Sequence, residues 1–367
     1  MNAKGAAAAP SAAAGRSAVP DMSTVEVIAP NLKQRLSGVT STIIQLVPVQ
    51  ARTLGIATIG PGLPDSLPKM RGWQLSSLRK RPKSGRDRIW HARRNTEMVA
   101  GLLLRDVLRA PLKLVFTSAA QRDHRPFTKW LIRQMDAVIA TGEKSASFLK
   151  VPHTVVMHGV DLDVFRPPAG DDDAFAASGL PGKYAIGCFG RVRHQKGTDL
   201  FVDAMIALLP HHPDWTAVIT GRVTAEHKAF ADELKERIAK AGLTDRIRFL
   251  GEVDDIKPWY QRVSLYVAPS RNEGFGLTPL EAMASQTAVV ASDAGAYAEM
   301  IVQGETGALV PAGDGNALRE AIRPYLADPA LTETHGINAL AEVRARFPLE
   351  REAEGVRRVY DHVWAMR

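Results

Sequence analysis

Short, nearly continuous runs of hydrophobic residues recur along the chain, separated by amphipathic or polar stretches. Central strands of a parallel sheet are buried on both faces, and runs of this length and character are typical of such strands. In the second half of the chain the pattern predicts strands at Tyr184–Gly190, Thr216–Thr220, Ile247–Gly251, Ser264–Pro269, Ala288–Ser292 and Thr306–Val310.

The first half carries a weaker version of the same alternation. It predicts strands at Thr24–Ala29, Ile56–Ile59, Leu112–Thr117, Ala137–Ala140 and Thr154–Met157. Helical stretches between the strands are expected at Val39–Leu54, Thr96–Arg109, Phe127–Met135, Thr198–Leu209, Ala225–Ala241, Asp254–Arg262 and from Asn316 onward. Alternating strands and helices favour the α/β class, with two doubly wound Rossmann-like domains facing a cleft.

Composition shifts suggest where the domains begin and end. Residues 1–21 are rich in Ala, Gly, Pro and Ser, which predicts a disordered tail or a functional start at Met22. Prolines and acidic residues between positions 165 and 173 resemble a linker. We therefore expect an N-terminal domain over 22–168, a C-terminal domain over 169–345, and a final helix within 346–367 that packs back on the N-terminal domain.

The basic charge of the chain is concentrated in one window. The net charge is +8, and Lys69–Arg94 contains ten Lys or Arg residues and one acid, Asp87. Such a window is expected to attract phosphate-rich partners, although a solubilising loop would have the same composition. Nucleic acid is disfavoured because only Trp73 and Trp90 could stack on bases there. No apolar run reaches membrane-spanning length, and the single cysteine, Cys188, excludes an intramolecular disulfide.

Two loops of the second half follow predicted strands and run directly into predicted helices. One is Gly190–Gly197, with the sequence GRVRHQKG, and the other lies within RNEGFGLTPLEAMA, residues 271–284. Free N–H groups and the helix dipole at such positions favour an anion. Arg191 and Lys196 add charge that suits a diphosphate, unless both are ordinary surface residues.

Two carboxylates, Glu273 and Glu281, flank the second loop. Thr278 and Pro279 followed by Glu281 have the pattern of a capping box, in which Glu281 would only stabilise the helix start. Beside a diphosphate, however, a carboxylate needs other hydrogen-bond donors, and sugar hydroxyls supply them. Glu273 would then bind a sugar joined to the diphosphate, and Glu281 the ribose of a nucleotide.

These motifs resemble the signature of the retaining GT-B glycosyltransferases, known as the glycosyltransferase family 4 type or "glycosyl transferases group 1". Besides GRVRHQKG and EGFGLTPLE, the resemblance rests on HGVDLDVFRP, TDRIRFLGEVDD, SLYVAPSRNEGFG, VVASDAGAYAEMI and ETGALVPAGD, in this order. It covers the chain from Met22 to the end and is stronger in the second half.

The resemblance implies a role for each matching residue. Arg191 and Lys196 would bind the donor diphosphate and stabilise the departing nucleotide without a metal, and Glu273 would contact the transferred sugar. The implied donor-binding residues are Gly38, Gly190, Val253, Gly274, Phe275, Gly276, Leu277, Thr278 and Glu281. Many relatives have a Gly-Gly pair where this chain has Ser37-Gly38, which is a departure from the family pattern. Retention, by attack on the same face as the leaving group, is implied by the family alone.

A histidine near the reacting sugar is also typical of the family. The strand predicted at Leu112–Thr117 is not followed directly by one. His124 is the nearest replacement and the preferred catalytic candidate, and His91 is the alternative. Either histidine could instead be structural.

Within the family, the segments IWHARRNTEM, LVFTSAAQRDH and KWLIRQMDAVIATGEKSASFL resemble the mannosyltransferases of lipopolysaccharide core synthesis. This implies GDP-mannose as donor and an anionic glycolipid of the Kdo–lipid A type as acceptor, at the inner face of the cytoplasmic membrane. The acceptor-side basic patch would comprise Arg79, Lys80, Arg81, Lys83, Arg86, Arg88, Arg93 and Arg94. Neither nucleic acid nor an obligate protein partner is expected.

Other functions remain open at this point. A UDP-sugar-dependent hexosyltransferase of lipopolysaccharide or exopolysaccharide synthesis would share the same motifs. So would a non-catalytic sugar-nucleotide-binding relative, whereas a GT-B epimerase or a simple polyanion-binding module is disfavoured by the intact Glu273, Glu281, Arg191 and Lys196.

Overall fold

The structure, a computed structural model, describes residues 18–34 and 38–366. These residues form two compact units. The N-terminal unit runs to Asp161 and resumes at Phe347, and the C-terminal unit comprises Leu162–Arg346. The chain therefore leaves the N-terminal unit seven residues earlier than the predicted boundary at 168.

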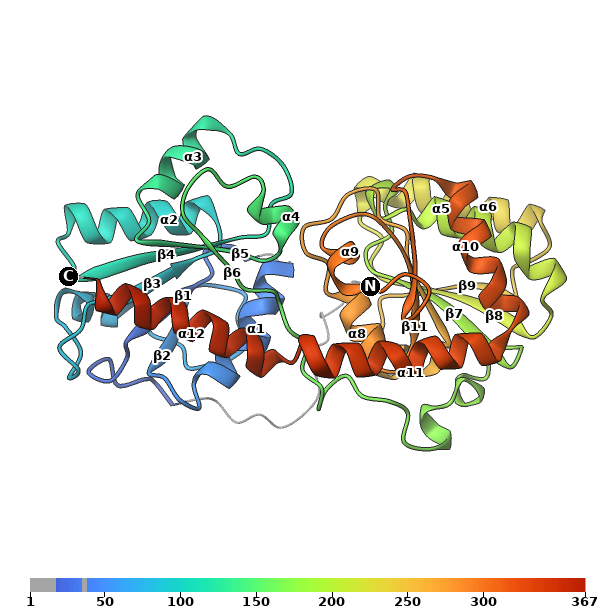
Figure 1. Ribbon diagram of the computed structural model, residues 1–367, viewed down its shortest axis with the longest axis horizontal. Coiled ribbons are helices and arrows are strands. Elements are labelled where there is room, and N and C mark those ends of the chain that lie inside the picture. Colours follow the sequence, from blue (N-terminus) through green and yellow to red (C-terminus); the bar gives the residue numbers. More distant parts are fainter. Residues whose placement is uncertain (1–17, 35–37, 367) are drawn as a thin grey trace, which may run out of the picture. The chain divides into compact units, whose positions relative to one another are not determined.

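The N-terminal unit is built on a six-stranded parallel sheet in the order β2-β1-β3-β4-β5-β6. The strands are β1 (Val27–Pro30), β2 (Ile56–Ile59), β3 (Arg88–Ala92), β4 (Leu112–Ser118), β5 (Ala137–Ala140) and β6 (Thr154–Val155). Its helices are α1 (Gly38–Gln50), α2 (Asn95–Leu102), α3 (Pro126–Arg133), α4 (Glu143–Ala146) and α12 (Leu349–Ala365). Helices α1 and α12 pack together on one face of the sheet, and α2 and α3 cover the other (Figure 1).

The final helix α12 belongs to the N-terminal unit. Val356, Val359 and Val363 are buried in the same cluster as Ile43 and Leu46 of α1. The Trp364 indole N–H donates to the carbonyl of Asp87 at 2.8 Å. Apolar contacts at helical spacing thus tie the end of the chain to its first helix.

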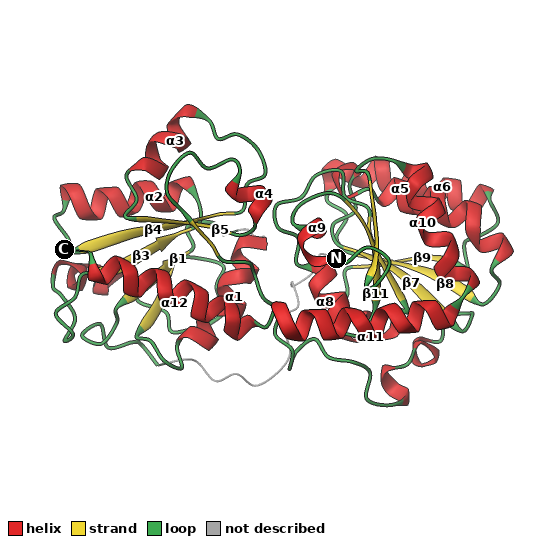
Figure 2. Cartoon of the chain, viewed as in Figure 1, coloured by secondary structure: helices red, strands yellow, loops and turns green. Residues whose placement is uncertain are grey.

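The C-terminal unit contains a second six-stranded parallel sheet, in the order β12-β11-β10-β7-β8-β9 (Figure 2). The strands are β7 (Tyr184–Phe189), β8 (Trp215–Thr220), β9 (Ile247–Gly251), β10 (Leu265–Ala268), β11 (Ala288–Ser292) and β12 (Gly307–Val310). The helices are α5 (Thr198–Leu208), α6 (Lys228–Lys240), α7 (Lys257–Arg262), α8 (Thr278–Ala284), α9 (Tyr297–Met300), α10 (Gly315–Ala327) and α11 (Pro329–Arg346). The predicted α/β class with two doubly wound sheets is confirmed, whereas a cleft between the units stays a prediction.

One strand was not predicted, and it changes the meaning of the basic window. Strand β3, Arg88–Ala92, runs through that window and is buried along its whole length. The guanidinium of Arg88 donates to the carbonyls of Val25 at 2.9 Å and Met22 at 2.7 Å, and also to those of Ser77 and Lys80. Arg88 is 1% exposed, so its assignment to a surface patch is wrong.

The predicted tail also ends earlier than expected. The Gln74 side-chain amide donates to the carbonyl of Pro20, and Asp21 accepts hydrogen bonds from Ser23. Met22 is buried. Residues 20–22 are therefore part of the N-terminal unit, and residues 1–17 lie outside the described residues. In the described part of the chain, none of the helices combines the length and apolar character needed to cross a bilayer.

Candidate functional site

The strand order of the C-terminal unit places two loops at a topological switch point. After β7 the chain continues to β8 on one side, while β10 pairs with β7 on the other side. In parallel α/β sheets, ligands bind outside the carboxyl ends of the strands at such a point. The loop after β7 is Gly190–Gly197 and the loop after β10 is Pro269–Leu277, so both predicted donor loops flank the crevice.

Polar contacts hold the two loops together. Arg271 forms a two-pronged ion pair with Asp199 at 2.8 and 2.7 Å and also donates to the carbonyl of His194. The Gln195 side chain donates to the carbonyl of Asn272 at 3.0 Å. Gly197 has φ +71°, and a Cβ there would lie 1.9 Å from a carbonyl oxygen of the neighbouring loop, so only glycine fits this close approach. These contacts fix the Gly190–Gly197 loop against the Pro269–Leu277 loop.

Lys196 of the first loop and Glu273 of the second loop are in contact. The Lys196 ammonium is hydrogen-bonded to Glu273 Oε2, although the residues are 77 positions apart. Both side chains are about one-fifth exposed, at 19% and 18%. The sequence assigned them to different groups of one ligand, and the structure brings them together as an ion pair. A donor that binds here would have to share Lys196 with Glu273.

A pocket between the loops connects these residues with the sheet. It is lined by Cys188, Phe189, Gly190, Arg191, Lys196, Thr198, Tyr266, Val267, Ala268, Pro269, Ser270, Thr278 and Tyr297. The first turn of α5 opens at Thr198, so its N–H groups and dipole lie beside Lys196 and Arg191. This combination of positive charge at a helix start suits a diphosphate.

The hydroxyl of Tyr297 lies in the wall of this pocket. The residue is fully buried, and Ser270 and Thr278 lie within hydrogen-bonding reach of its hydroxyl. Burial raises the pKa of the phenol, and the nearby Glu273 adds to the effect, so it is a neutral donor at pH 7.

Glu281 does not form the predicted capping box. Helix α8 begins at Thr278, its N-cap position is Leu277, and no side chain caps it. Glu281 Oε2 instead accepts a hydrogen bond of 2.7 Å from the hydroxyl of Tyr260 on α7. Burial raises the pKa of the Glu281 carboxyl, and the Tyr260 hydrogen bond partly opposes the rise. The Glu281 carboxyl group is therefore held in place by Tyr260, with acceptor capacity left for a ligand hydroxyl.

The remaining donor residues are less closely grouped. Gly274, Phe275, Gly276 and Leu277 form the end of the β10–α8 loop, and Val253 follows β9 in the loop that leads into α7. Gly38 is the first residue of α1 in the N-terminal unit. Ser37 lies outside the described residues.

The two candidate histidines differ in how many of their ring nitrogens are hydrogen-bonded within the protein. Both ring nitrogens of His91 are engaged, by the Tyr360 hydroxyl and by Thr117 Oγ1, each at 2.6 Å. Burial lowers the pKa of His91 well below its ordinary value. His124 lies at the carboxyl end of β4, with Nε2 3.3 Å from the Ser118 hydroxyl, and burial lowers its pKa too. The contacts make His91 a structural residue and favour His124 as the available base.

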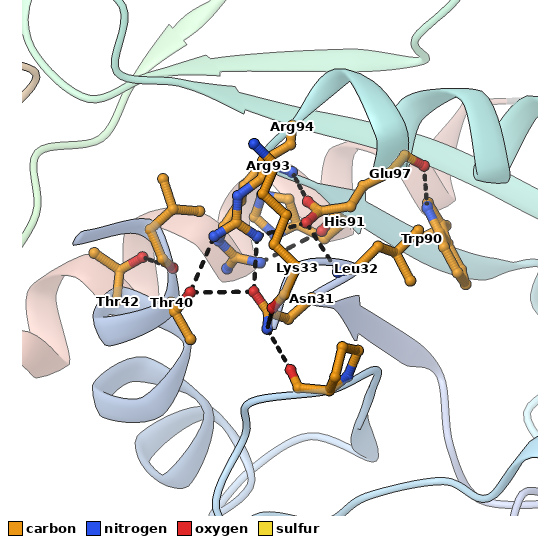
Figure 3. A network of polar contacts seen from close by, with 12 residues as sticks. Asn31, Leu32, Lys33, Thr40, Thr42, Trp90, His91, Arg93, Arg94 and Glu97 are labelled. Atoms are coloured by element: carbon orange, nitrogen blue, oxygen red, sulfur yellow. Dashed lines mark hydrogen bonds and ion pairs between the residues drawn. The ribbon is translucent and has the colours of Figure 1, made fainter. Parts of the chain in front are cut away.

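Several charged residues of the basic window form a buried network at the carboxyl ends of β1 and β3 (Figure 3). Glu97 is fully buried and accepts from Arg94 Nη1 at 2.7 Å and from the Arg93 backbone N–H at 2.7 Å. Arg94 also donates to Asn31 at 2.7 Å and to Thr40 at 3.0 Å. Arg94 thus positions the loop after β1 with its side chain only 11% exposed, and its place in an acceptor-side patch stays a prediction.

Arg93 is the exception within this network. Its guanidinium forms one long hydrogen bond, 3.4 Å, to the His91 carbonyl. No carboxylate of the described residues lies within ion-pair distance of it, although Glu97 and Glu352 are close enough to act electrostatically. Burial lowers its pKa, yet as an arginine it stays charged at neutral pH. Of the patch residues, Arg79, Lys80, Arg81, Lys83 and Arg86 are exposed.

Comparison with known proteins agrees with this architecture. The family model "Glycosyl transferases group 1" matches residues 183–328. The chain is 67% identical to the lipopolysaccharide core biosynthesis mannosyltransferase LpcC of Rhizobium leguminosarum bv. viciae, over 94% of this chain and 98% of that protein. It belongs to the glycosyl transferases group 1 family. Within the family it groups with LpcC and with LpsB of Rhizobium meliloti (strain 1021), also named a lipopolysaccharide core biosynthesis mannosyltransferase, to which it is 56% identical over 93% of this chain and 98% of that protein.

Solved structures of glycosyltransferases share the fold. HepE of Anabaena, in complex with UDP and glucose, superposes with a TM-score of 0.78 at 19% identity, covering 92% of this chain and all of that one. The C-terminal domain of a group 1 glycosyltransferase (LpcC) from Francisella tularensis is 38% identical and covers 52% of this chain and 99% of that one, with a TM-score of 0.50. Its extent corresponds to roughly half of this glycosyltransferase.

Three residues of the glycosyltransferase site escaped the sequence analysis. Tyr260 donates its hydroxyl to Glu281, Tyr297 lines the pocket, and Arg271 joins the two loops. Tyr297 lies in the motif VVASDAGAYAEMI and Arg271 opens the RNEGFG stretch, so both were within quoted motifs. In the described part of the chain no cluster of three or more His, Cys, Asp or Glu has the arrangement of a metal site.

Replacing Glu281 by glutamine is expected to stabilise the unliganded glycosyltransferase while weakening nucleotide binding roughly tenfold. An amide still accepts from Tyr260 but avoids the burial of a charge. Because the folded-state pKa of Glu281 is raised, its charge makes folding less favourable as pH rises from the unfolded pKa through the folded one. Thermal unfolding across this pH range and nucleotide titration would measure both effects. Glu226→Gln, on an exposed turn, is the control, and a lower melting temperature in Glu281→Gln would contradict the expectation.

Proposed function

We propose that this glycosyltransferase transfers mannose from GDP-mannose to a lipopolysaccharide inner-core acceptor of the Kdo–lipid A type, with retention of configuration. The observation that carries the proposal is the 67% identity to LpcC over nearly the whole of both proteins. The pocket supports it, because Arg191 and Lys196 line it as a diphosphate requires, and Glu273 is paired with Lys196 beside it.

The proposed chemistry at the donor site is electrostatic. As the bond between the sugar and the diphosphate breaks, negative charge grows on the departing phosphate. Arg191, Lys196 and the start of α5 would stabilise that charge. Glu273 would orient the sugar hydroxyls, and Glu281 with Tyr260 would hold the ribose. The acceptor hydroxyl would attack from the face that the nucleotide leaves.

No metal takes part in the proposed reaction. The positive charge that a divalent cation would bring to the diphosphate is supplied in this proposal by Lys196 and Arg191. We therefore expect full activity after treatment with a chelator.

The N-terminal unit is proposed to bind the acceptor. Arg93 lies directly after β3, at the carboxyl edge of the sheet, and its guanidinium has hydrogen-bonding capacity left over. An anionic group, such as a carboxylate or phosphate of the glycolipid, would match it. His124, at the end of β4, would lie on the same edge. Because this acceptor is anchored in a bilayer, the protein would work at the cytoplasmic membrane surface.

A donor–acceptor matrix tests the proposed function. Purified protein is incubated with Kdo–lipid A and, in separate reactions, GDP-mannose, UDP-glucose, UDP-galactose or UDP-N-acetylglucosamine, with and without a chelator. We expect transfer from GDP-mannose alone, unaffected by the chelator, with an α-linked product by NMR. Transfer only from a UDP-sugar would refute the mannose assignment. Stabilisation by a nucleotide without any transfer would indicate a non-catalytic binding protein.

A further inference from the structure

Exposed apolar side chains gather on one part of the N-terminal unit. Most large hydrophobic residues of the unit are buried, but six exposed ones lie on α2, its continuation and α3. We call this the α2–α3 surface, formed by Val99, Leu103, Val107, Leu108, Phe127 and Trp130. Val107 is 67% exposed, Phe127 58% and Trp130 51%. Such a concentration on one surface indicates an interaction site.

The spacing along each helix turns these residues outward together. Val99, Leu103 and Val107 follow each other at four-residue intervals along α2 and the π-helical turn Leu103–Val107 that continues it. On α3, Phe127 and Trp130 are three residues apart, and their rings stack with centroids 6.0 Å apart. The opposite side of each helix faces the sheet, since Met98 of α2 and Leu131 of α3 are buried in the core.

The two helices form one surface because they pack side by side. Asn95 at the start of α2 donates to Thr128 of α3 at 2.7 Å. Farther along, Arg105 donates to the carbonyl of Gln134, just after α3, at 3.2 Å. Both helices cover the same face of the sheet (Figure 1).

Positive charge surrounds the aromatic pair. Between positions 122 and 133 the chain has four basic residues, Arg122, Arg125, Lys129 and Arg133, and one acid, Asp123. The acid is neutralised by Lys129 at 2.6 Å. Arg122, Arg125 and Arg133 are exposed. Segments that lie at the surface of an anionic bilayer typically combine exposed Trp and Phe with exposed arginines.

The position of the surface selects a bilayer over a protein partner. The loop that carries Arg122 and His124 follows β4, and α3 begins two residues after His124. A bilayer resting on α3 would therefore hold its headgroups beside the carboxyl edge of the sheet. A lipid-anchored acceptor must reach this edge, whereas the basic window centred on Lys80 has one large exposed aromatic residue, Trp73, and no comparable apolar cluster among the described residues.

We propose that the α2–α3 surface docks on an anionic phospholipid bilayer, with Phe127 and Trp130 at headgroup level and the arginines on lipid phosphates. This proposal rests on the proposed function in one respect, namely that the acceptor is held in a membrane. It makes the α2–α3 surface, rather than the basic window, the principal contact with the membrane.

Vesicle binding by the full-length protein tests the proposal. Flotation is measured with vesicles of phosphatidylcholine alone and of phosphatidylcholine mixed with phosphatidylglycerol. The wild type should bind the anionic vesicles, and the double variant Phe127→Ser/Trp130→Ser should bind roughly tenfold more weakly. Trp73→Ser is the matched control, because it removes an exposed tryptophan from the basic window, and it should bind as the wild type does. Equal binding by the double variant and the wild type would overturn the proposal.

Two further readouts separate the remaining outcomes. The double variant should keep wild-type turnover on a water-soluble, deacylated acceptor and lose it on acceptor in vesicles, which excludes misfolding as the cause. Vesicle binding that depends on Phe127 and Trp130 without transfer from any donor would overturn the proposed function and leave the docking surface intact. A concentration-dependent dimer that the double variant abolishes, with unchanged vesicle binding, would assign the surface to self-association and refute the proposal.

Discussion

Replacing Lys196 by alanine is expected to lower the turnover number about 10²–10³-fold. The variant loses the charge that faces the departing diphosphate. It also leaves Glu273, its ion-pair partner in the structure, as an unpaired carboxylate next to that diphosphate. Steady-state transfer from GDP-mannose measures the effect, with circular dichroism to establish that the variant is folded.

The pairing of Lys196 with Glu273 makes a sharper expectation possible. If the two side chains act as a unit, the double variant Lys196→Ala/Glu273→Gln should be barely worse than Lys196→Ala alone. Lys228→Ala is the control, since Lys228 forms an exposed ion pair with Asp232 in the same unit and should keep full activity. Turnover by Lys196→Ala within a few-fold of the wild type would refute the assigned role.

The second large effect concerns stability. Arg88→Ala should destabilise the N-terminal unit by roughly 3 kcal/mol or more, because each buried acceptor left without its donor costs about 1–3 kcal/mol. The substitution leaves the carbonyls of Met22, Val25, Ser77 and Lys80 without their shared donor and opens a cavity beside β3. Urea unfolding followed by tryptophan fluorescence measures the change.

Arg79 provides the matched comparison. It lies in the same basic window but is exposed, so Arg79→Ala should change the free energy of unfolding by less than about 0.5 kcal/mol. Equal urea midpoints for Arg88→Ala and Arg79→Ala would indicate that both side chains lie at the surface, and this would contradict the structure.

The sequence predicted best those strands that consist of an uninterrupted apolar run. Ala137–Ala140 and Ala288–Ser292 were placed at their observed bounds because apolar runs in a parallel sheet need no partner to be recognised. Strand β3 was missed because it begins with an arginine and contains His91. The Arg88 guanidinium is satisfied by the carbonyls of Met22, Val25, Ser77 and Lys80, and the His91 ring by Thr117 and Tyr360. That pairing cannot be seen along the chain.

The site shows the same limit. The motifs predicted the two donor loops, since glycine turns before helices are local features. The Lys196–Glu273 pair was not predicted, because it joins residues 77 positions apart. The capping box at Thr278 was wrong because Tyr260 on α7 offers Glu281 a hydroxyl that no local pattern reveals. Local chemistry is therefore predictable here, while the partner of each charge is not.

Helix α12 gives the molecule an order of assembly. The N-terminal unit is completed only by the last residues of the chain, whose valines and Tyr360 fill the cluster around α1. The unit of residues 162–346 has its whole sheet and all its helices earlier. During synthesis on the ribosome, the proposed donor-binding half is thus free to fold first. The proposed acceptor-binding half, although translated first, must wait until residues 349–365 have left the ribosome. A nascent polypeptide cut short before residue 349 would keep a complete donor half beside an open apolar face.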